Sequence, residues 1–518
     1  MIKIVEIKCT PAEERDDTAI QQLAAAASGV GIEDIDTVQK LRRSIDARSK
    51  WPQYVLRLQV FIGEEPKPEP CFLSGLAPVD SGKKVVIVGA GPAGYFAALE
   101  LIKAKIKPVV LDRGKDVQTR RRDLRLIQQH SLVNPDSNYC FGEGGAGTYS
   151  DGKLYTGSKK RGPVKDILQI LVEHGANPEI LFDAHPHIGS NRLPEIIAAI
   201  RETIQKFGGE IHFESKVTDF LIENNLCKGV VANNDVEYTG DAVILATGHS
   251  ARDIFHLLEK KKIQIQAKPF AMGIRVEHPQ AIIDQMQYHQ NPRNPLLPAA
   301  SYKIVTHKDG RAVFSFCMCP GGLIVPAATA PGEIVLNGMS MAKRDSRFAN
   351  SGIVVAIEPE DAVQFAEYGE LRCLYYQRDL EQKIFKAGDG SQRAPAQRMP
   401  DFVEGKLSSD LAPASYIPGI YSAPLQEMLP KHISQRLQSA FQEFGKKYRG
   451  YFTAEANLVG VESRTSSPIR IPRDREKFTH VDIAKLYPAG EGAGYAGGIV
   501  SAALDGQAVA RALVVNEY

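Results

Sequence analysis

The chain has 518 residues, of which 43% are hydrophobic and 24% are charged, and its formal net charge is +2. Such a composition is typical of soluble globular proteins, and the length predicts about three domains of roughly 150 residues. The small net charge argues against electrostatic capture of nucleic acid or of a membrane by the whole surface.

Neither the beginning of the chain nor its cysteines indicate export. Residues 1–8 alternate charged with apolar side chains, unlike a secretory signal. The seven cysteines are scattered over a long chain, which fits reduced thiols better than a disulfide framework. The apolar stretches are interrupted by glycine turns, so no transmembrane span is predicted. We therefore expect a cytoplasmic protein.

Residues 1–75 are expected to form a small α+β domain. Residues 2–8 and 54–62 alternate as half-buried strands, and residues 11–28 predict a helix with Thr10 as its N-cap. A basic cluster at residues 40–50 is interpreted as a solvated edge, with anion or partner binding as the alternative. The proline-rich residues 64–70 predict a linker.

The most informative segment begins with an apolar run at residue 85 that ends in Gly89-x-Gly91-x-x-Gly94. A helical pattern follows, and a second apolar run ends at Asp112, which is placed to accept hydrogen bonds from a ribose hydroxyl. This strand–turn–helix–strand unit is typical of dinucleotide binding, because its glycines permit a tight turn, close approach of a pyrophosphate and close helix packing. The helix N-terminus also favours phosphate. The turn residues expected at the cofactor are Gly89, Gly91, Pro92, Ala93 and Gly94.

Several further elements follow before residue 265. Residues 141–152 contain five glycines, which implies backbone that approaches something closely or takes positive φ. Residues 193–208 predict a helix and residues 210–214 a strand. Residues 228–239 predict a hairpin, and residues 242–248 predict a buried strand that ends in a glycine turn.

Residues 266–455 show a different pattern from the preceding segment, with several strands followed by long helices, and are expected to form a separate α+β domain. The patterns predict strands at 271–277, 302–306, 313–317 and 333–336, and helices at 360–386 and 425–447. Residues 387–423 are rich in Pro, Gly and Ser and are interpreted as a long loop or lid. Residues 486–504 predict a short strand, a glycine loop and an alanine-rich helix.

The glycine unit at Gly89, the strand ending at Gly248 and the glycine-rich segment 489–506 occur in an order that resembles the glutathione-reductase-like flavoprotein superfamily. Within it, residues 43–48, 144–154 and 317–322 resemble the uncharacterised family of FAD-dependent, or NAD-utilising, dehydrogenases. The resemblance implies an α/β fold in which residues 80–265 and 456–518 form a Rossmann-type FAD-binding domain of the glutathione-reductase type. Residues 266–455 would be an inserted α+β substrate domain, and residues 1–75 a small N-terminal α+β domain.

The resemblance also implies where FAD would contact the chain. Asp112 would hold the adenosine ribose, Arg113 would lie along the adenine edge, and the glycine loop near Gly145 would lie against the isoalloxazine. Glu491 stands where the superfamily usually has Asp, at a position that bonds the ribityl or phosphate groups. The implied cofactor residues beyond the first turn are Asp112, Arg113, Gly144, Gly145, Val217, Thr247, Gly248, Gly490, Glu491, Gly497, Gly498 and Ile499.

The activity implied by the resemblance is that of an FAD-dependent oxidoreductase which passes a hydride through flavin N5. A small molecule would be the substrate, and NAD(P)H is a candidate transient electron donor. Residues 115–240 offer no second strand followed by Gly-x-Gly-x-x-Gly. Either nicotinamide docks without a domain of its own, or the substrate is itself the reductant.

Three residues are candidates for the catalytic chemistry. Cys317 and Cys319 would face one side of an extended strand, as a flavin-linked thiol or disulfide reductase would need. A disulfide between residues i and i+2 departs from the preferred geometry, so a buried or substrate-lining strand is favoured. His249, together with Arg252, either contacts the flavin or substrate or lies in an exposed turn.

Other polar residues suggest further ligands. Arg275, His278, Lys343, Arg344 and Arg464 are candidates for an anionic substrate, with ordinary surface positions as the default. His185 and His187 lack a third ligand at suitable spacing, so no metal is expected. A flavin-bearing RNA-binding or RNA-modifying protein is a third hypothesis, but residues 1–75 hold 10 Lys and Arg against 12 Asp and Glu, which disfavours a polyanion.

Overall fold

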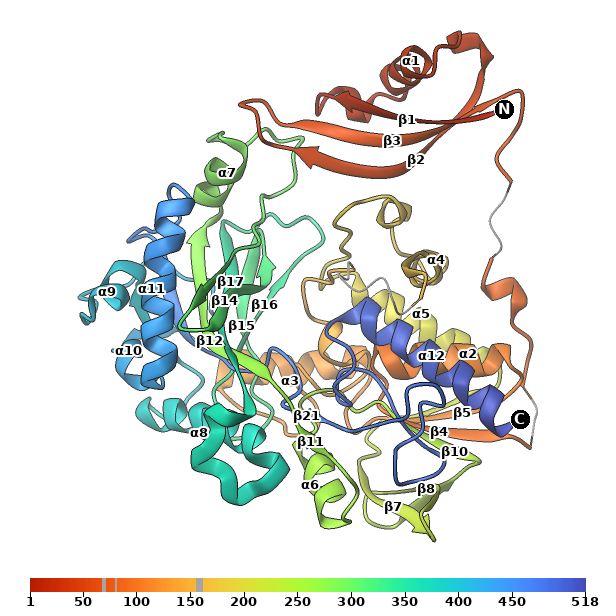
Figure 1. Cartoon of the computed structure of the whole chain (residues 1–518), viewed down its shortest axis with the longest axis vertical. Coiled ribbons are helices and arrows are strands. Elements are labelled where there is room, and N and C mark those ends of the chain that lie inside the picture. The colour runs from red at the N-terminus through yellow and green to blue at the C-terminus, as the bar shows by residue number, and fades with distance from the viewer. Residues whose placement is uncertain (68–70, 80–81, 155–161) are drawn as a thin grey trace.

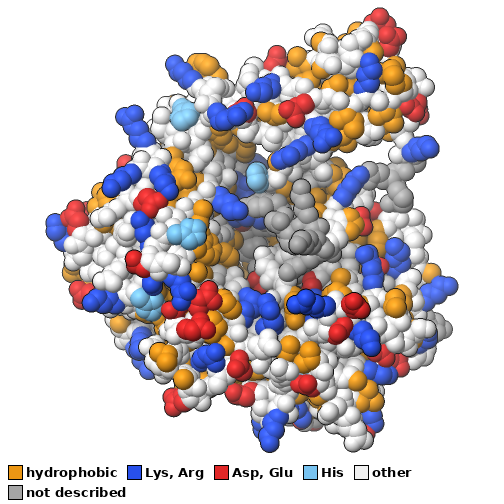
Figure 2. Space-filling view, in the orientation of Figure 1, with side chains coloured by type: hydrophobic (Ala, Val, Ile, Leu, Met, Phe, Trp, Pro, Cys, Tyr) orange, Lys and Arg blue, Asp and Glu red, His pale blue; other side chains and the backbone are white. Residues whose placement is uncertain are grey.

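The computed structural model describes residues 1–67, 71–79, 82–154 and 162–518, and Figure 1 shows their arrangement. The last three residues of the predicted linker, 68–70, lie outside the described residues. Figure 2 shows a hollow between the N-terminal domain and the rest of the molecule, with Lys and Arg side chains around it.

The N-terminal domain is a three-stranded antiparallel sheet with one helix packed on it (Figure 1). The strand order is β1 (Ile2–Cys9), β3 (Gln53–Ile62), β2 (Ile35–Asp46), and the helix is α1 (Asp17–Ser28). The helix begins later than predicted because Asp16, not Thr10, caps it by accepting from the N–H groups of Thr18 and Ala19. The basic cluster, which was not predicted to be regular structure, lies largely on β2.

The second domain is built on a five-stranded parallel sheet. Its order is β22 (Leu486–Pro488), β10 (Ala242–Leu245), β4 (Lys84–Val88), β5 (Lys107–Leu111), β6 (Glu210–His212). Successive side chains of β4 point to opposite faces, so Ile87 joins the core with the helices while Val86 and Val88 join a core on the other face. Both faces of the sheet are therefore covered, as expected for parallel strands.

The covering elements fall into two groups. The helices of the first face include α2 (Pro92–Lys103), α4 (Val164–Glu173), α5 (Leu193–Lys206) and α12 (Ile499–Glu517). The second face carries α6 (Arg252–Lys260) and the antiparallel sheet β7 (Val217–Glu223), β8 (Leu226–Ala232), β9 (Val236–Thr239). Helix α3 (Val117–His130) contacts α5.

Helix α12 is long and apolar enough to cross a membrane by length and composition alone. Its most apolar window is 61% buried inside the protein, and the helix packs against α2. The apolar side chains of α12 thus contribute to the core of the parallel-sheet domain.

The third domain is built on a seven-stranded mixed sheet. Its order is β13 (Val305–Lys308), β14 (Arg311–Cys319), β17 (Phe348–Ile357), β12 (Phe270–Pro279), β20 (Asn457–Glu462), β18 (Ala394–Arg398), β19 (Ile420–Ser422). Because β20 pairs with β12 and β18, the sheet extends past the boundary predicted at residue 455. Smaller pairs are β15 (Gly322–Pro326) with β16 (Leu336–Ser340), and β11 (Gln266–Ala267) with β21 (Ile469–Arg470).

Several predicted elements of this domain need correction. The helix predicted at 360–386 divides into a 3-10 segment (Pro359–Leu371), interrupted at Gly369 with φ +53°, and α8 (Arg372–Ala387). The helix predicted at 425–447 divides at Pro430 into α10 (Leu425–Met428) and α11 (Lys431–Lys447). Residues 387–423 are not a loop, because they contain β18, α9 (Met399–Glu404) and β19. The remaining helix is α7 (Gln280–Tyr288).

Two predicted strands are displaced along the chain. The strand predicted at 302–306 is β13, which begins at Val305, and the one predicted at 333–336 is β16, which begins at Leu336. In both places residues just before the strand are buried although they lie outside its ladder, so burial alone misplaces the boundary.

Candidate functional site

One cleft gathers most of the residues that the sequence assigns to a cofactor. Its wall comes from the turns after β4 and β10, the glycine loop after α3, the end of β14 and the start of α12. The predicted residues that line it are Gly89, Gly91, Pro92, Ala93, Asp112, Arg113, Gly145, Val217, Thr247, Gly248, His249, Cys317, Arg464, Glu491, Gly497, Gly498 and Ile499.

Among the predicted cofactor and catalytic residues, four do not line this cleft: Gly94, Gly144, Gly490 and Cys319. Three of them are glycines that allow close packing behind the wall. A Cβ atom on Gly144 would lie 2.0 Å from the Thr148 hydroxyl, and one on Gly490 would lie 2.8 Å from the Ala93 Cβ. Their contribution is to the shape of the cleft.

The turn after β4 has the geometry that its glycines predict. Gly89 has φ +110°, and a Cβ there would lie 2.4 Å from the carbonyl oxygen of Ala246. A Cβ on Gly94 would lie 1.9 Å from the carbonyl oxygen of Gly89, so α2 packs directly on the turn. A Cβ on Gly91 would meet no atom of the other described residues within 4 Å. Gly91 therefore presents bare backbone to the cleft at the N-terminus of α2, where N–H groups favour an anion.

The carboxylate of Asp112 is held by backbone groups of three turns. It accepts hydrogen bonds from the N–H groups of Ala90 at 2.9 Å, Gly114 at 2.8 Å and Gly142 at 3.1 Å. Each carboxylate oxygen has more than one acceptor site, so these bonds leave room for a ligand hydroxyl. The neighbouring Arg113 pairs with Asp253 at 2.6 Å.

The glycine loop is anchored from beneath by charged side chains that the sequence interpretation did not assign. Arg120 is fully buried and donates to the carbonyl oxygens of Asn138, Glu143 and Gly145. The buried Glu143 carboxylate pairs with Arg201 at 2.9 Å. These contacts hold the loop against the first turn, since a Cβ on Gly145 would lie 3.4 Å from the Cα of Gly91.

Whether the cleft fits FAD can be judged from one hydroxyl that lacks a partner and from the glycines that leave backbone exposed along the cleft. In the described parts of the chain, the Thr247 hydroxyl is buried without a hydrogen-bond partner. Cβ atoms on Gly248, Gly497 and Gly498 would meet no described atom within 4 Å, as for Gly91. Bare backbone and an unsatisfied hydroxyl along one cleft fit a ligand with phosphate and ribityl oxygens.

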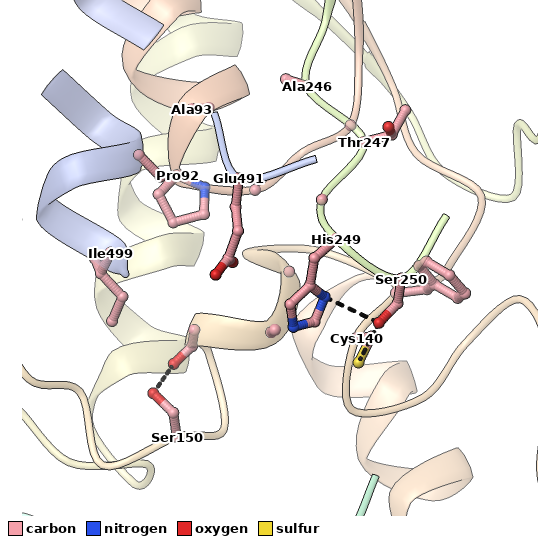
Figure 3. A pocket seen from close by; sticks show the side chains of 18 of the residues that line it. Pro92, Ala93, Cys140, Ser150, Ala246, Thr247, His249, Ser250, Glu491 and Ile499 are labelled. Carbon is pink, nitrogen blue, oxygen red and sulfur yellow. Dashed lines mark hydrogen bonds between the residues drawn. The ribbon is translucent and has the colours of Figure 1, made fainter. Parts of the chain in front are cut away.

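Two titratable side chains project into the same cavity (Figure 3). Enclosure in the cleft raises the pKa of Glu491 to about 7. Burial and the nearby cations Arg464 and Arg252 lower the pKa of His249 to about 4, so its imidazole is neutral at pH 7. His249 is held by a 2.9 Å hydrogen bond between its Nδ1 and the Ser250 hydroxyl. It therefore contacts the cleft and is not part of an exposed turn.

A cluster of four charges lies beside the cleft and joins α6 to the third domain. Arg464 contacts Glu333 at 2.8 Å and Glu381 at 2.9 Å, and Arg252 contacts the same two carboxylates at 2.9 and 2.8 Å. Although burial opposes it, the two cations lower the pKa of Glu381 to about 2. Arg464 is thus committed to a buried structural network as well as lining the cleft.

The other candidate anion binders also have structural partners or lie at the surface. Arg275 is fully buried and pairs with Glu462 at 2.6 Å. His278 is fully buried, with its Nε2 at 2.8 Å from the Tyr451 carbonyl oxygen. Arg344 pairs with Asp151, and Lys343 is exposed. The default expectation of surface positions is wrong for Arg275 and His278, because the sheet buries both, and neither lines the cleft.

The two cysteines occupy different positions at one end of the cleft. Cys317 lines the cleft, whereas Cys319 is fully buried behind it. The ammonium of Lys153 lies 3.9 Å from the Cys319 sulfur. Lys153 and Asn337 line the cleft here as well. Both lie outside the residues that sequence reasoning assigned to the site.

Histidines and basic residues elsewhere serve the connection between domains. His187 Nε2 lies 3.0 Å from the Ala342 carbonyl oxygen, and the described residues hold no group of three His, Cys, Asp or Glu side chains suited to a metal. Arg43 of the basic cluster pairs with Glu14, Glu179 and Asp183. That arginine docks the N-terminal domain and does not form part of a solvated edge.

A signal for some of the missed residues is present in the sequence. Arg120, Leu124 and Ile127 follow a helical period on the buried face of α3, so an arginine on that face predicts a buried anchor. Asn337 and Lys153 give no comparable signal, because only the packing of separate domains brings them to one cleft.

Models of three families match the chain. Residues 1–61 match a domain of unknown function (DUF8436), residues 83–266 match the pyridine nucleotide-disulphide oxidoreductases, and residues 269–465 match the C-terminal domain-like region of FAD-dependent proteins. The last two matches include much of the cleft lining, whereas Glu491 and the start of α12 lie beyond the matched residues.

Similar proteins include a full-length relative and remote structural likenesses. An uncharacterised protein of Clostridium beijerinckii is 38% identical over 504 residues, which cover 93% of each chain. The structure of CtdE in complex with FAD is 10% identical, covers 84% of this chain and 85% of that chain, and has a TM-score of 0.32. A flavocytochrome c3 fumarate reductase is 12% identical, covers 85% and 78%, and has a TM-score of 0.35.

The match to the pyridine nucleotide-disulphide oxidoreductases spans the glycine turns after β4 and β10. The fold is a mixed α/β fold with a Rossmann-like FAD-binding domain. The chain belongs to the same family as the Clostridium protein, a family of FAD-dependent oxidoreductases.

Proposed function

We propose that the cleft binds FAD in the manner of glutathione-reductase-type flavoproteins and that a small substrate exchanges a hydride with it. The observation that carries this proposal is the convergence of three glycine turns, after β4, after β10 and before α12, on one cleft that also holds the unpartnered Thr247 hydroxyl. Bound FAD would supply hydride transfer at its N5 atom, and the protein would bind and orient it.

On this proposal the cleft residues would divide according to the parts of FAD that they contact. Asp112, Arg113 and Val217 would hold the adenosine end, and Gly91 at the N-terminus of α2 would meet the pyrophosphate. The glycine loop and the backbone of Gly497 and Gly498 would hold the flavin end. The start of α12 would place the positive end of a helix dipole there, which stabilises negative charge on a reduced ring.

The substrate would meet the end of the cleft lined by Lys153, Asn337 and Cys317. The ammonium of Lys153 favours an anionic small molecule, and the Asn337 amide can orient it. Because the pKa of Glu491 is raised to about 7, its carboxyl holds a proton near neutral pH and can release it within the cleft.

NAD(P)H is the candidate electron donor. Support for a dedicated nicotinamide domain is lacking, because the described residues contain only one sheet with three or more parallel strands. We infer transient docking of nicotinamide at the FAD cleft, or reduction by the substrate itself. We also propose a cytoplasmic location, because seven cysteines scattered over a long chain do not resemble a disulfide framework.

The experiment is reconstitution followed by anaerobic mixing. The apoprotein is titrated with FAD, and the reconstituted protein is then mixed with NADH or NADPH while flavin absorbance is followed. Uptake of FAD and bleaching by one nucleotide are the expected results. Failure to take up FAD would overturn the proposal, and bleaching by neither nucleotide would remove NAD(P)H and leave the substrate as reductant.

A further inference from the structure

Cys317 has an unusual backbone for a residue in a strand. Its φ is +46°, in the left-handed region, and it lies in the bulge between Phe316 and Cys319 where β14 loses register with β17. Bulges redirect side chains next to active sites, and strained non-glycine residues concentrate there. Here the bulge places Cys317 in the wall of the cleft while Cys319 stays buried behind it.

The two cysteines share a local environment rich in cations. The Cys319 thiol donates to the Cys317 carbonyl oxygen at 3.3 Å, and the Arg275 guanidinium lies 3.8 Å from the Cys319 sulfur. A hydrogen bond from Cys319, with Lys153 and Arg275 nearby, lowers the pKa of Cys317 to about 5, although burial opposes this. The charged groups that face Cys317 are Lys153 and Asp151 from the glycine loop, Arg275 from β12, Glu462 from β20 and Glu491 from the loop before α12.

The preference for a buried or substrate-lining strand rested on the poor geometry of a disulfide between residues i and i+2 of a regular strand. In the structure the side chain of Cys319 reaches back to Cys317 across the bulge. One sulfur is accessible from the cleft and the other lies directly behind it, which is the arrangement of an attacking thiol and its resolving partner.

We infer that Cys317 and Cys319 are a dithiol–disulfide redox pair at the substrate end of the cleft, with a small disulfide as the substrate class and Lys153 as the residue that keeps Cys317 reactive. This inference rests on the proposed binding of FAD in the same cleft. It adds the identity of the electron acceptor and the residues that contact it.

The electrons and protons balance as follows. The Cys317–Cys319 disulfide accepts two electrons from the reduced cofactor and takes up one proton, which gives the Cys317 thiolate and the Cys319 thiol. The Cys317 thiolate attacks a substrate disulfide and releases one thiolate, which receives the proton of Cys319. The Cys319 thiolate then attacks the Cys317 sulfur, releases the second substrate thiolate and restores the protein disulfide.

The first test counts electrons in the FAD-reconstituted protein by anaerobic dithionite titration. The oxidised wild type should consume four electron equivalents, two for FAD and two for the disulfide, whereas Cys317→Ser and Cys319→Ser should consume two. Thiol titration after denaturation should find five free thiols in the oxidised protein and seven in the reduced protein, out of seven cysteines. Cys71→Ser, at an exposed cysteine that does not line the cleft, is the matched control and should still consume four.

The second test uses bis(2-hydroxyethyl) disulfide as the probe. Prereduced wild-type protein should return to oxidised flavin absorbance on anaerobic mixing with the probe, and prereduced Cys317→Ser should not. Normal FAD binding by the serine variants shows that they are folded. Two electron equivalents and seven free thiols in the oxidised wild type would overturn the inference while leaving FAD binding, and so the proposed function, intact.

The third test addresses Lys153 as a positioning residue. The rate of alkylation of Cys317 by iodoacetamide follows the thiolate fraction. Lys153→Met should raise the midpoint of the pH profile. At a pH below both midpoints, each pH unit of this rise should slow alkylation about tenfold relative to the wild type. Lys153→Arg should restore the wild-type midpoint. An unchanged profile in Lys153→Met would exclude this role.

Discussion

The carboxylate of Asp112 accepts a 3.1 Å hydrogen bond from the backbone N–H of Gly142. The same carboxylate accepts from the N–H groups of Ala90 and Gly114, so one side chain connects the dinucleotide turn, the end of β5 and the glycine loop. The residue that sequence reasoning assigned to a ribose is therefore also the residue that assembles the cleft.

Asp112→Ala should damage both stability and cofactor binding. Three backbone N–H groups would lose a charged acceptor, and each such bond contributes about 1.5–3 kcal/mol. We expect the free energy of unfolding in urea to fall by about 3 kcal/mol or more and the Kd for FAD, measured by fluorescence titration, to rise more than tenfold. Asp112→Asn keeps one acceptor oxygen and should lose less. Wild-type stability and affinity in Asp112→Ala would contradict this account.

Two neighbouring glycines should respond differently to alanine. In Gly94→Ala the new Cβ would lie 1.9 Å from the Gly89 carbonyl oxygen, so we expect overpacking to lower the free energy of unfolding of the apoprotein by about 1–3 kcal/mol. In Gly91→Ala the Cβ would meet nothing within 4 Å in the part of the chain that the structure describes. That variant should fold like the wild type yet bind FAD at least tenfold more weakly. Equal unfolding midpoints for the two apoproteins would show that the close approach at Gly94 is unimportant.

Arg43→Met should loosen the N-terminal domain. The Arg43 side chain is 16% exposed and pairs with three carboxylates that span Glu14 and residues 179–183. Loss of this side chain should lower the free energy of unfolding by about 1.5–3 kcal/mol. It should also increase hydrogen exchange in β2 and in residues 179–184.

The matched control for Arg43 is Arg48→Met. Arg48 pairs with Asp46 on the same strand end, but its side chain is 87% exposed. Exposed ion pairs contribute about 0–1 kcal/mol, so this variant should leave hydrogen exchange at the domain junction unchanged. Similar exchange in both variants would argue against docking through Arg43.

Glu277 should make stability depend on pH. It is 2% exposed, and burial raises its pKa to about 7 from 4.5. The folded protein therefore binds more protons than the unfolded chain between these values, so the contribution of Glu277 is fully present below pH 4.5 and is lost as the pH rises through 7.

The test compares the wild type with Glu277→Gln in urea unfolding from pH 5 to pH 8. The variant cannot ionise, and its amide oxygen can still accept from the Ser415 N–H, which the wild-type carboxylate does at 2.8 Å. Relative to the wild type, its free energy of unfolding should rise with pH by up to about 1.4 kcal/mol per unit below pH 7. Parallel pH profiles for the two proteins would refute the raised pKa.

Sequence reasoning located elements well where the pattern is local and strong. The predicted strands at 2–8 and 242–248 and the helix at 193–208 correspond to β1, β10 and α5. It failed where tertiary contacts override local preference. Residues 394–398 look like loop by composition, but β18 becomes regular through backbone bonds to β20, a partner about 60 residues away.

The sequence by itself determined the cofactor turn, because the backbone freedom that Gly89, Gly91 and Gly94 supply depends on residue type at fixed local spacing. It also determined the order of the three glycine segments and, with them, the resemblance to flavoproteins. These features require no knowledge of distant contacts.

Only the tertiary structure decided which charged side chains meet at the cleft and which groups they contact. Whether a charged side chain binds a ligand or a neighbour depends on what burial places beside it, and this is why Arg275 pairs with Glu462, 187 residues away, while Lys153 reaches Cys319 across 166 residues. Desolvation strengthens such contacts and penalises an unpaired charge. The charged side chains are evident in the local sequence, but their contacts form only when the three domains pack together.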